Sequence, residues 1–173
     1  MLVTGPPGAG KTTLARPLAR TLGLPLLAKD TVKEALFDSL GVGDRDWSRR
    51  LGRASFEVLY MLAAEVPAAV LDANFGAEAG PRLRAIGTPL VEVFCRCPAA
   101  EAERRFVARA RRRHPGHVDH SLSPEITAAL AAGVGPLALG GPVLEADTGR
   151  PVDVDAVAAW VRALAGRPGG GPV

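Results

Sequence analysis

Short apolar runs alternate along the chain with longer amphipathic stretches. The apolar runs predict β-strands at about residues 1–4, 24–28, 68–73, 89–97 and 142–147. The stretches between them have the spacing of helices, at about residues 11–22, 31–40, 47–65, 81–86, 99–113, 124–132 and 153–165. Apolar strands separated by helices are typical of a parallel sheet covered on both faces. The pattern therefore predicts an α/β fold of three layers around a five-stranded parallel sheet.

No internal repeat or linker interrupts this alternation, and 173 residues suit one domain. We expect a single domain over residues 1–165, with a lid at about residues 104–124. The glycine- and proline-rich segment 166–173 has nothing to bury and predicts a disordered tail. We find no signal-peptide pattern and no apolar run of about 18 residues, so we expect a cytoplasmic protein without a membrane partner.

Composition adds a local concentration of charge to this picture. Apolar residues make up 47% of the chain and the net charge is only +3, which does not indicate a general nucleic-acid coat. Six of the 18 arginines, however, lie between Arg104 and Arg113 on one predicted helix. Cys95 and Cys97 are two residues apart on a predicted strand, a spacing that disfavours a disulfide and leaves free thiols as the expectation.

A glycine-rich segment follows the first predicted strand and matches the phosphate-binding P-loop pattern G-x-x-x-x-G-K-[ST]. Glycines allow the backbone to turn successive N–H groups toward an anion, and the next helix points its N-terminus at the same place. Lys11 is expected to bind the β- and γ-phosphates, and Thr12 the Mg²⁺ ion that bridges them. The predicted nucleotide-binding residues are Gly5, Pro6, Pro7, Gly8, Ala9, Gly10, Lys11, Thr12 and Thr13. We therefore expect a P-loop NTPase that binds a nucleoside triphosphate with Mg²⁺.

Asp30 comes after the second predicted strand, at the edge where doubly wound sheets bind ligands. A carboxylate that faces the γ-phosphate can accept the proton of an acceptor hydroxyl, which would make Asp30 the catalytic base. The alternative is that Asp30 only caps a helix beginning at Thr31. Position alone leaves both roles open.

Asp72 ends the third predicted strand, in the usual place for a second Mg²⁺ anchor, although a strand-end turn is the alternative. Asn74 and Phe75 lie just beyond it and are expected to contact the acceptor together with Asp30. Other aromatic residues could add an apolar wall to the acceptor pocket, although core packing is the alternative for the last two: Trp47, Phe56 and Tyr60.

The arginine-rich helix predicts a lid over the triphosphate. Arg105, Arg109 and Arg112 are four and three residues apart, so they share one face if the helix continues through them. From that face they could stabilise the charge that builds up in the transition state, as catalytic residues beside Lys11 and Asp30. The alternative is a solvent-exposed basic face.

His114, His117 and His120 recur at intervals of three, with Asp119 among them. A metal site is disfavoured because Pro115 breaks any helix that could hold these ligands together. A hinge or a substrate contact is the expected role of this loop.

These motifs together resemble the small P-loop kinases of the chloramphenicol phosphotransferase-like and zeta-toxin-like group, often labelled ATP-binding AAA-type proteins. The resemblance runs from GPPGAGKTT through LLAKDTVKEALFDSLG, VLDANF and the arginine-rich segment to VLEADTGRPVDVDAVAAWV. It implies that ATP is the donor, that Asp30 is the base toward a substrate hydroxyl, and that a lid arginine stacks on adenine. It also implies which residues lie beside the base: Asp147, Thr148 and Gly149.

The sequence thus favours an ATP-dependent phosphotransferase that moves the γ-phosphate to a hydroxyl of a small molecule. A polynucleotide 5′-hydroxyl kinase is the main alternative, but only eight aromatic residues are present and none alternates with the arginines. A non-catalytic ATP-binding module is another. A regulatory GTPase is disfavoured because no Asn-Lys-x-Asp motif is present, and a ring-forming AAA+ motor because no residues remain for a helical lid domain.

Overall fold

The computed structural model describes residues 1–110, 112–117, 135–137 and 139–165. Several predictions fall outside this part of the chain: the helix at about 124–132, the second half of the lid with Asp119 and His120, and the tail at 166–173.

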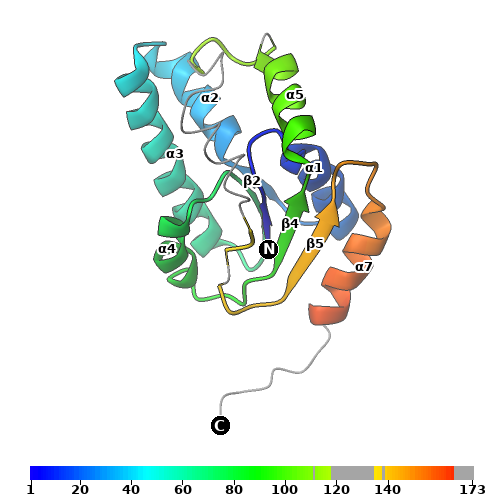
Figure 1. Cartoon of the computed structure of the whole chain (residues 1–173). Coiled ribbons are helices and arrows are strands. Elements are labelled where there is room, and N and C mark those ends of the chain that lie inside the picture. Colours follow the sequence, from blue (N-terminus) through cyan, green and yellow to red (C-terminus); the bar gives the residue numbers. More distant parts are fainter. Residues whose placement is uncertain (111, 118–134, 138, 166–173) are drawn as a thin grey trace.

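In the described part of the chain, five short strands form one parallel sheet in the order β2-β3-β1-β4-β5 (Figure 1). Their bounds are β1 Leu2–Thr4, β2 Leu26–Ala28, β3 Val70–Asp72, β4 Glu92–Arg96 and β5 Val143–Asp147. Each strand lies inside a predicted run, and every pairing is parallel, so the predicted sheet is confirmed. β1 is central, with β3 on one side and β4 on the other. After β1 the chain builds β2 and β3 on one side of it and then β4 and β5 on the other. Such a reversal of strand order opens a crevice at the carboxyl end of the central strand, where α/β proteins bind ligands.

Helices cover both faces of this sheet. Their bounds are α1 Lys11–Leu22, α2 Lys29–Leu40, α3 Arg45–Glu65, α4 Gly80–Arg84, α5 Ala99–Ala110 and α7 Val154–Ala165, with a 3₁₀ turn Ala77–Ala79 before α4. α1 and α7 pack on one face, and α3 and α4 on the other (Figure 1). α2 packs along α3, and α5 stands above the carboxyl ends of the strands (Figure 1). The predicted three-layer α/β fold is therefore confirmed. None of the described helices is both long and apolar enough to cross a membrane.

Two successive residues of β1 show how the sheet divides the core. Leu2 and Val3 are both fully buried, and as neighbours in a strand they point to opposite faces. Val3 belongs to the cluster that contains Leu14 of α1. Leu2 belongs to the cluster that contains Leu59 of α3. Burial of each such side chain contributes about 2 kcal/mol, so β1 is anchored from both sides and holds the loop that follows it in a fixed place.

Candidate functional site

The P-loop, residues 5–12, joins β1 to α1 at the carboxyl edge of the sheet. Gly5 and Gly8 have positive φ angles of 136° and 79°. A β-carbon at Gly8 would lie 2.0 Å from the carbonyl oxygen of Ala102 in α5. One at Gly5 would lie 2.6 Å from the carbonyl oxygen of Cys95 in β4, one of the two free thiols. These glycines are therefore required both by their torsions and by the close approach of neighbouring backbone.

Lys11 lies over the P-loop and is held there by the loop itself. Its Nζ donates hydrogen bonds to the carbonyl oxygens of Gly5 (2.9 Å) and Pro6 (2.8 Å). Burial lowers the pKa of Lys11 to about 8, although the charge of Asp72 acts in the opposite direction. A phosphate bound in the loop would favour the charged amine, so the site suits an anionic ligand.

Thr12 and Asp72 meet beside Lys11 and offer two oxygen atoms. The Thr12 hydroxyl donates a hydrogen bond to the carboxylate of Asp72, which is only 5% exposed at the end of β3. Burial raises the pKa of Asp72, whereas the bond from Thr12 and the charge of Lys11 act to lower it. A divalent cation bound here would offset the cost of burying the carboxylate, and oxygen ligands are those that Mg²⁺ prefers. The two residues expected to bind Mg²⁺ therefore lie together, and their donor atoms fit that ion.

Asp30 lies in the first turn of α2, because this helix begins at Lys29, two residues earlier than predicted. The N-cap residue is Ala28, so the alternative in which Asp30 only caps the helix is wrong. Its carboxylate accepts hydrogen bonds from Lys29 (3.2 Å) and Arg113 (3.1 Å). Burial acts to raise the pKa of Asp30, but these two cations outweigh burial and hold the pKa at about 2. The group is therefore a carboxylate at neutral pH.

A cavity of about 220 Å³, called the inner cavity below, lies between the P-loop, α2, the end of β3 and the turn after α5. Among the residues predicted from the sequence, those that line it are Pro7, Gly8, Gly10, Lys11, Thr12, Thr13, Asp30, Asp72, Asn74 and Arg109. Four charged or titratable residues that were not predicted for the site also line it: Lys29, Lys33, Arg113 and His117. The cavity thus brings the expected base, the P-loop lysine and the expected metal ligands into one space.

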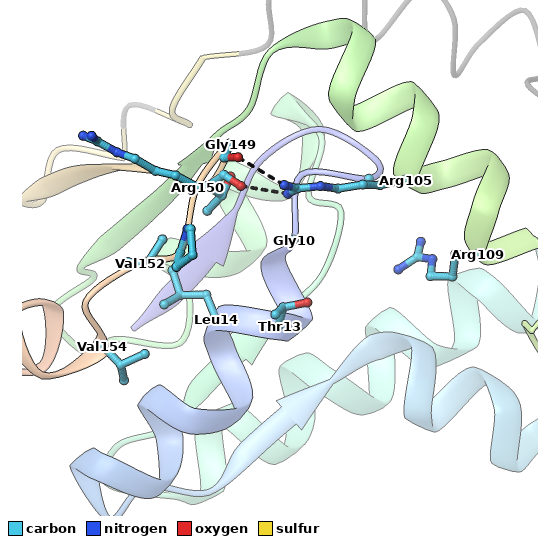
Figure 2. A pocket seen from close by; sticks show the side chains of 12 residues that line it. Gly10, Thr13, Leu14, Arg105, Arg109, Gly149, Arg150, Val152 and Val154 are labelled. Carbon is cyan, nitrogen blue, oxygen red and sulfur yellow. Dashed lines mark hydrogen bonds between the residues drawn. The ribbon is translucent and has the colours of Figure 1, made fainter.

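A larger cleft of about 650 Å³, called the outer cleft, lies between α1, α5 and the segment after β5 (Figure 2). Arg105 crosses this cleft and donates to the carbonyl oxygens of Thr148 (2.7 Å) and Gly149 (3.3 Å). The carboxylate of Glu101 holds the same guanidinium at 2.6 Å. The size is typical of small-ligand sites. Apolar side chains form the opposite wall: Leu14, Pro151, Val152 and Val154.

Asp147 shapes the turn beside the outer cleft and is not part of its lining, whereas Thr148 and Gly149 are. The Asp147 carboxylate accepts hydrogen bonds from the backbone N–H of Gly149 (3.0 Å) and pairs with Arg150 (3.2 Å). Two of the three residues expected beside the base therefore reach the cleft, and the third supports their turn.

With this geometry in place, comparison with known proteins identifies the family. Residues 1–131 match the family model described as an AAA domain. The chain belongs to this AAA domain family. A presumed kinase from Chloroflexus aurantiacus is 35% identical, and its solved structure superposes with a TM-score of 0.85 over 94% of this chain and 96% of that one. The predicted resemblance to small P-loop kinases is thereby confirmed.

Two further similar proteins are named as kinases. A gluconokinase from Sinorhizobium meliloti has a TM-score of 0.64 over 95% of this chain and 91% of that one, at 17% identity, which shows a common fold alone. A shikimate kinase from Paracidovorax citrulli is 38% identical over 94 residues, which are 49% of this chain and 50% of that protein. The chain spans half or less of the length of the curated relatives that it matches.

The three predicted lid arginines of this AAA domain protein do not all lie on one face: Arg105 and Arg109 both line the outer cleft, but Arg112 does not. α5 ends at Ala110, and the N–H groups of Arg112 and Arg113 bond to carbonyl oxygens only three residues earlier, at 2.9 and 3.5 Å. A turn closed over three residues is wound more tightly than an α-helix, so the side chains of Arg112 and Arg113 point in other directions than they would on a continued helix. As a result, Arg112 is exposed and does not line the inner cavity, whereas Arg113 does. Arg109 lines both the inner cavity and the outer cleft, as expected for a residue over the triphosphate (Figure 2).

His114 and His117 dock the turn after α5 onto α2. His114 Nε2 lies 3.0 Å from Asp38 Oδ1, and His117 Nε2 lies 2.9 Å from Glu34 Oε1. Phe37 stacks on His114, with ring centroids 5.4 Å apart. Among the described residues, no group of three or more His, Cys, Asp or Glu side chains is arranged to hold a metal ion. These contacts support a docking role for the turn.

Phe75 is a core residue, so its expected contact with the acceptor is a wrong prediction. It is 7% exposed and packs against Phe56, with ring centroids 5.8 Å apart. Tyr60 stacks on Phe56 in turn, at 6.0 Å. Trp47, in the first turn of α3, donates its indole N–H to the backbone carbonyl of Gly41, which follows α2. Asn74, next to Phe75, is exposed and lines the inner cavity. Among the described residues of the segment after β3, it alone has both properties.

A signal for two of the missed residues was present in the sequence. Lys29 and Lys33 are two of only three lysines in the chain, and they lie one residue before and three residues after Asp30. Once α2 is known to begin at Lys29, the two lysines are four residues apart and share a helix face. Arg113 had no comparable signal, because its direction depends on where α5 ends.

Proposed function

We propose that this AAA domain protein transfers the γ-phosphate of ATP to a hydroxyl group of a small molecule. The observation that carries this proposal is the inner cavity, where the ionised carboxylate of Asp30 and the P-loop lysine Lys11 face the same space. The kinase relatives support the same class of reaction, and those named for gluconate and shikimate act on small alcohols.

The outer cleft is the proposed site of the adenine base. The base would lie against the apolar wall formed by Leu14 and Val152, with the guanidinium of Arg105 above it. The triphosphate would then run through the P-loop toward Lys11, and Arg109 would reach it from the lid.

In the reaction, Asp30 would accept a hydrogen bond from the acceptor hydroxyl and orient its oxygen for in-line attack on the γ-phosphorus. The new O–P bond forms as the bond between the γ-phosphorus and ADP breaks. Because the pKa of Asp30 is about 2, this carboxylate is a weak base and would take the proton late in the transfer. Lys11 and Arg109 would stabilise the charge on the γ-phosphoryl oxygens.

Thr12 and Asp72 are the residues that would hold Mg²⁺. When bound, this ion neutralises charge on the β- and γ-phosphates.

A polynucleotide 5′-hydroxyl kinase is less well supported. Such an enzyme needs an open channel with stacking aromatic side chains, whereas the inner cavity has about 220 Å³ and Phe56 and Phe75 pack together in the core.

A transfer screen with radiolabelled ATP tests the proposal, using small alcohols, sugars, nucleosides, antibiotics and 5′-hydroxyl oligonucleotides as acceptors. We expect label on a small alcohol, and a rate about 10²-fold lower for Asp30→Asn. Label on oligonucleotides alone, or an Asp30→Asn enzyme with unchanged turnover, would contradict the proposal.

A further inference from the structure

The charges around Asp30 indicate the class of acceptor. We infer that the acceptor alcohol carries a small anionic group, a carboxylate or a phosphate, which binds Lys29 and Arg113 beside Asp30. This inference rests on the proposed function and specifies the substrate of the same site.

Cations outnumber carboxylates in the inner cavity. Among the described residues that line it, five side chains are cationic and two are acidic: Lys11, Lys29, Lys33, Arg109 and Arg113, against Asp30 and Asp72. A nucleoside triphosphate accounts for the cations that face the P-loop, Lys11 and Arg109. It does not account for those on the opposite wall, which surround Asp30.

Two cations share the single carboxylate of Asp30. Lys29 Nζ lies 3.2 Å from Oδ1, and Arg113 lies 3.1 Å from Oδ2. The side chains of Lys29 and Arg113 are only 16% and 13% exposed, whereas that of Asp30 is 48% exposed. One carboxylate neutralises one of these two charges. A charge that is mostly removed from water without a counter-ion is costly, so an anion bound beside Asp30 would be stabilised.

The neighbouring acidic residue of α2, Glu34, is engaged elsewhere. Its carboxylate pairs with His117, and His117 in turn fixes the direction of Arg113. Arg113 can only donate, so His117 Nδ1 accepts its hydrogen bond at 3.1 Å, and Nε2 then carries the proton that Glu34 accepts. The guanidinium is therefore held in place by a neutral imidazole, and among the described residues Asp30 is the carboxylate that hydrogen-bonds to it directly.

Lys33 lines the same cavity, one helical turn after Lys29. It is 7% exposed, and its Nζ donates to the hydroxyl of Ser48 at 2.8 Å.

The arrangement also links recognition to reaction. With the cavity as described, both oxygens of Asp30 accept hydrogen bonds from cations. An anionic group on the acceptor would take a share of Lys29 and Arg113 and leave a carboxylate oxygen free for the hydroxyl. A neutral alcohol would have to compete with these cations for Asp30, so discrimination should affect kcat as well as KM.

The test measures phosphotransfer by the full chain with Mg²⁺ and ATP in two matched series: glycerol, glycerate and glycerol 3-phosphate, and glucose, gluconate and glucose 6-phosphate. We expect an anionic member to exceed its neutral counterpart at least 100-fold in kcat/KM. Arg113→Met and Lys29→Met should each reduce this ratio at least tenfold. Arg53→Met, which changes an exposed arginine of α3 outside the cavity lining, should leave the ratio unchanged.

Equal or better transfer to the neutral members would overturn the inference and leave the proposed function standing. A second measurement separates the two proposals if none of the six compounds is phosphorylated. Calorimetry then tests whether the anionic compounds bind to enzyme saturated with a non-hydrolysable ATP analogue and Mg²⁺. Binding that both methionine variants abolish supports the anion site, while the absent transfer counts against the kinase proposal. No binding of any anionic compound overturns the inference.

Discussion

The two sides of the inner cavity are built in different ways. The phosphate side is one continuous piece of chain, from β1 through the P-loop into α1. The acceptor side is assembled from α2, the end of β3 and the turn at residues 112–117, and the residues joined by its Asp30–Arg113 pair are 83 positions apart. Local torsions and helix geometry suffice to form the first side, whereas the second exists only after tertiary packing. Damage to the acceptor side should therefore spare nucleotide binding, and damage to the phosphate side should abolish both binding and transfer.

The largest effect is expected from Lys11→Met on the phosphate side. This change removes the buried ammonium group from the γ-phosphate, and kcat should fall about 10³-fold. Calorimetry should also show weaker binding of ATP. Normal ATP affinity in this variant would contradict the assignment of Lys11 to the triphosphate.

Asp30→Asn on the acceptor side should separate the two functions. We expect kcat to fall about 10²-fold because the amide cannot accept the hydroxyl proton. The dissociation constant for ATP should change less than threefold, since Asp30 lies across the cavity from the P-loop. A large loss of ATP affinity would show that the two sides are not independent.

Arg113→Met and Arg112→Met sharpen the comparison within the acceptor side. The two variants remove the same charge from adjacent positions, but only Arg113 lines the inner cavity. We expect kcat/KM for the acceptor to fall at least tenfold in the first variant and less than twofold in the second. The reverse order would mean that the lid helix continues to residue 113 when substrates bind, as the sequence pattern suggested.

The smallest effect concerns stability and pH. The pKa of Asp30 in the folded protein is about 2, below its ordinary value of 3.8, so the ionised group stabilises the fold above about pH 4. This contribution disappears as the pH falls toward 2. Because the side chain is half exposed, the loss in Asp30→Asn should be below about 1 kcal/mol at pH 7. Denaturant unfolding at pH 7 and pH 3 should show the difference between the two proteins shrinking at the lower pH.

The sequence was a good guide to whatever is encoded locally. Alternation of apolar runs with helical stretches located every described strand and α-helix, and the P-loop pattern pointed to Lys11 and Thr12, which line the inner cavity. Asp72 could be selected from the sequence because it ends an apolar run, and it also lines the inner cavity.

The wrong predictions concern side chains whose direction depends on where a helix ends or on packing against residues that are distant in the sequence. Arg112 was chosen over Arg113 because periodicity cannot show that the helix tightens and ends at Ala110. Phe75 was assigned to the acceptor although the second core cluster, with Phe56 nearby, draws it inward. One of the cations beside Asp30 is Arg113, which is 83 residues away in the sequence, and no local sequence pattern indicates that the two residues are in contact.

The contact between Gly8 and Ala102 has a mechanical consequence. A β-carbon on Gly8 would come within 2.0 Å of the Ala102 carbonyl oxygen, so the first turn of α5 already packs against the P-loop backbone and cannot move closer to it. A tilt of α5 toward the P-loop would therefore pivot at this contact, and at 1.5 Å per residue Arg105 lies about 5 Å from the pivot while Ala110 lies about 12 Å away. A rotation of roughly 10° would shift Arg105 by less than about 1 Å and the far end by about 2 Å. We expect the phosphorylated product to escape while ADP is still gripped, so that nucleotide departure comes last in each turnover.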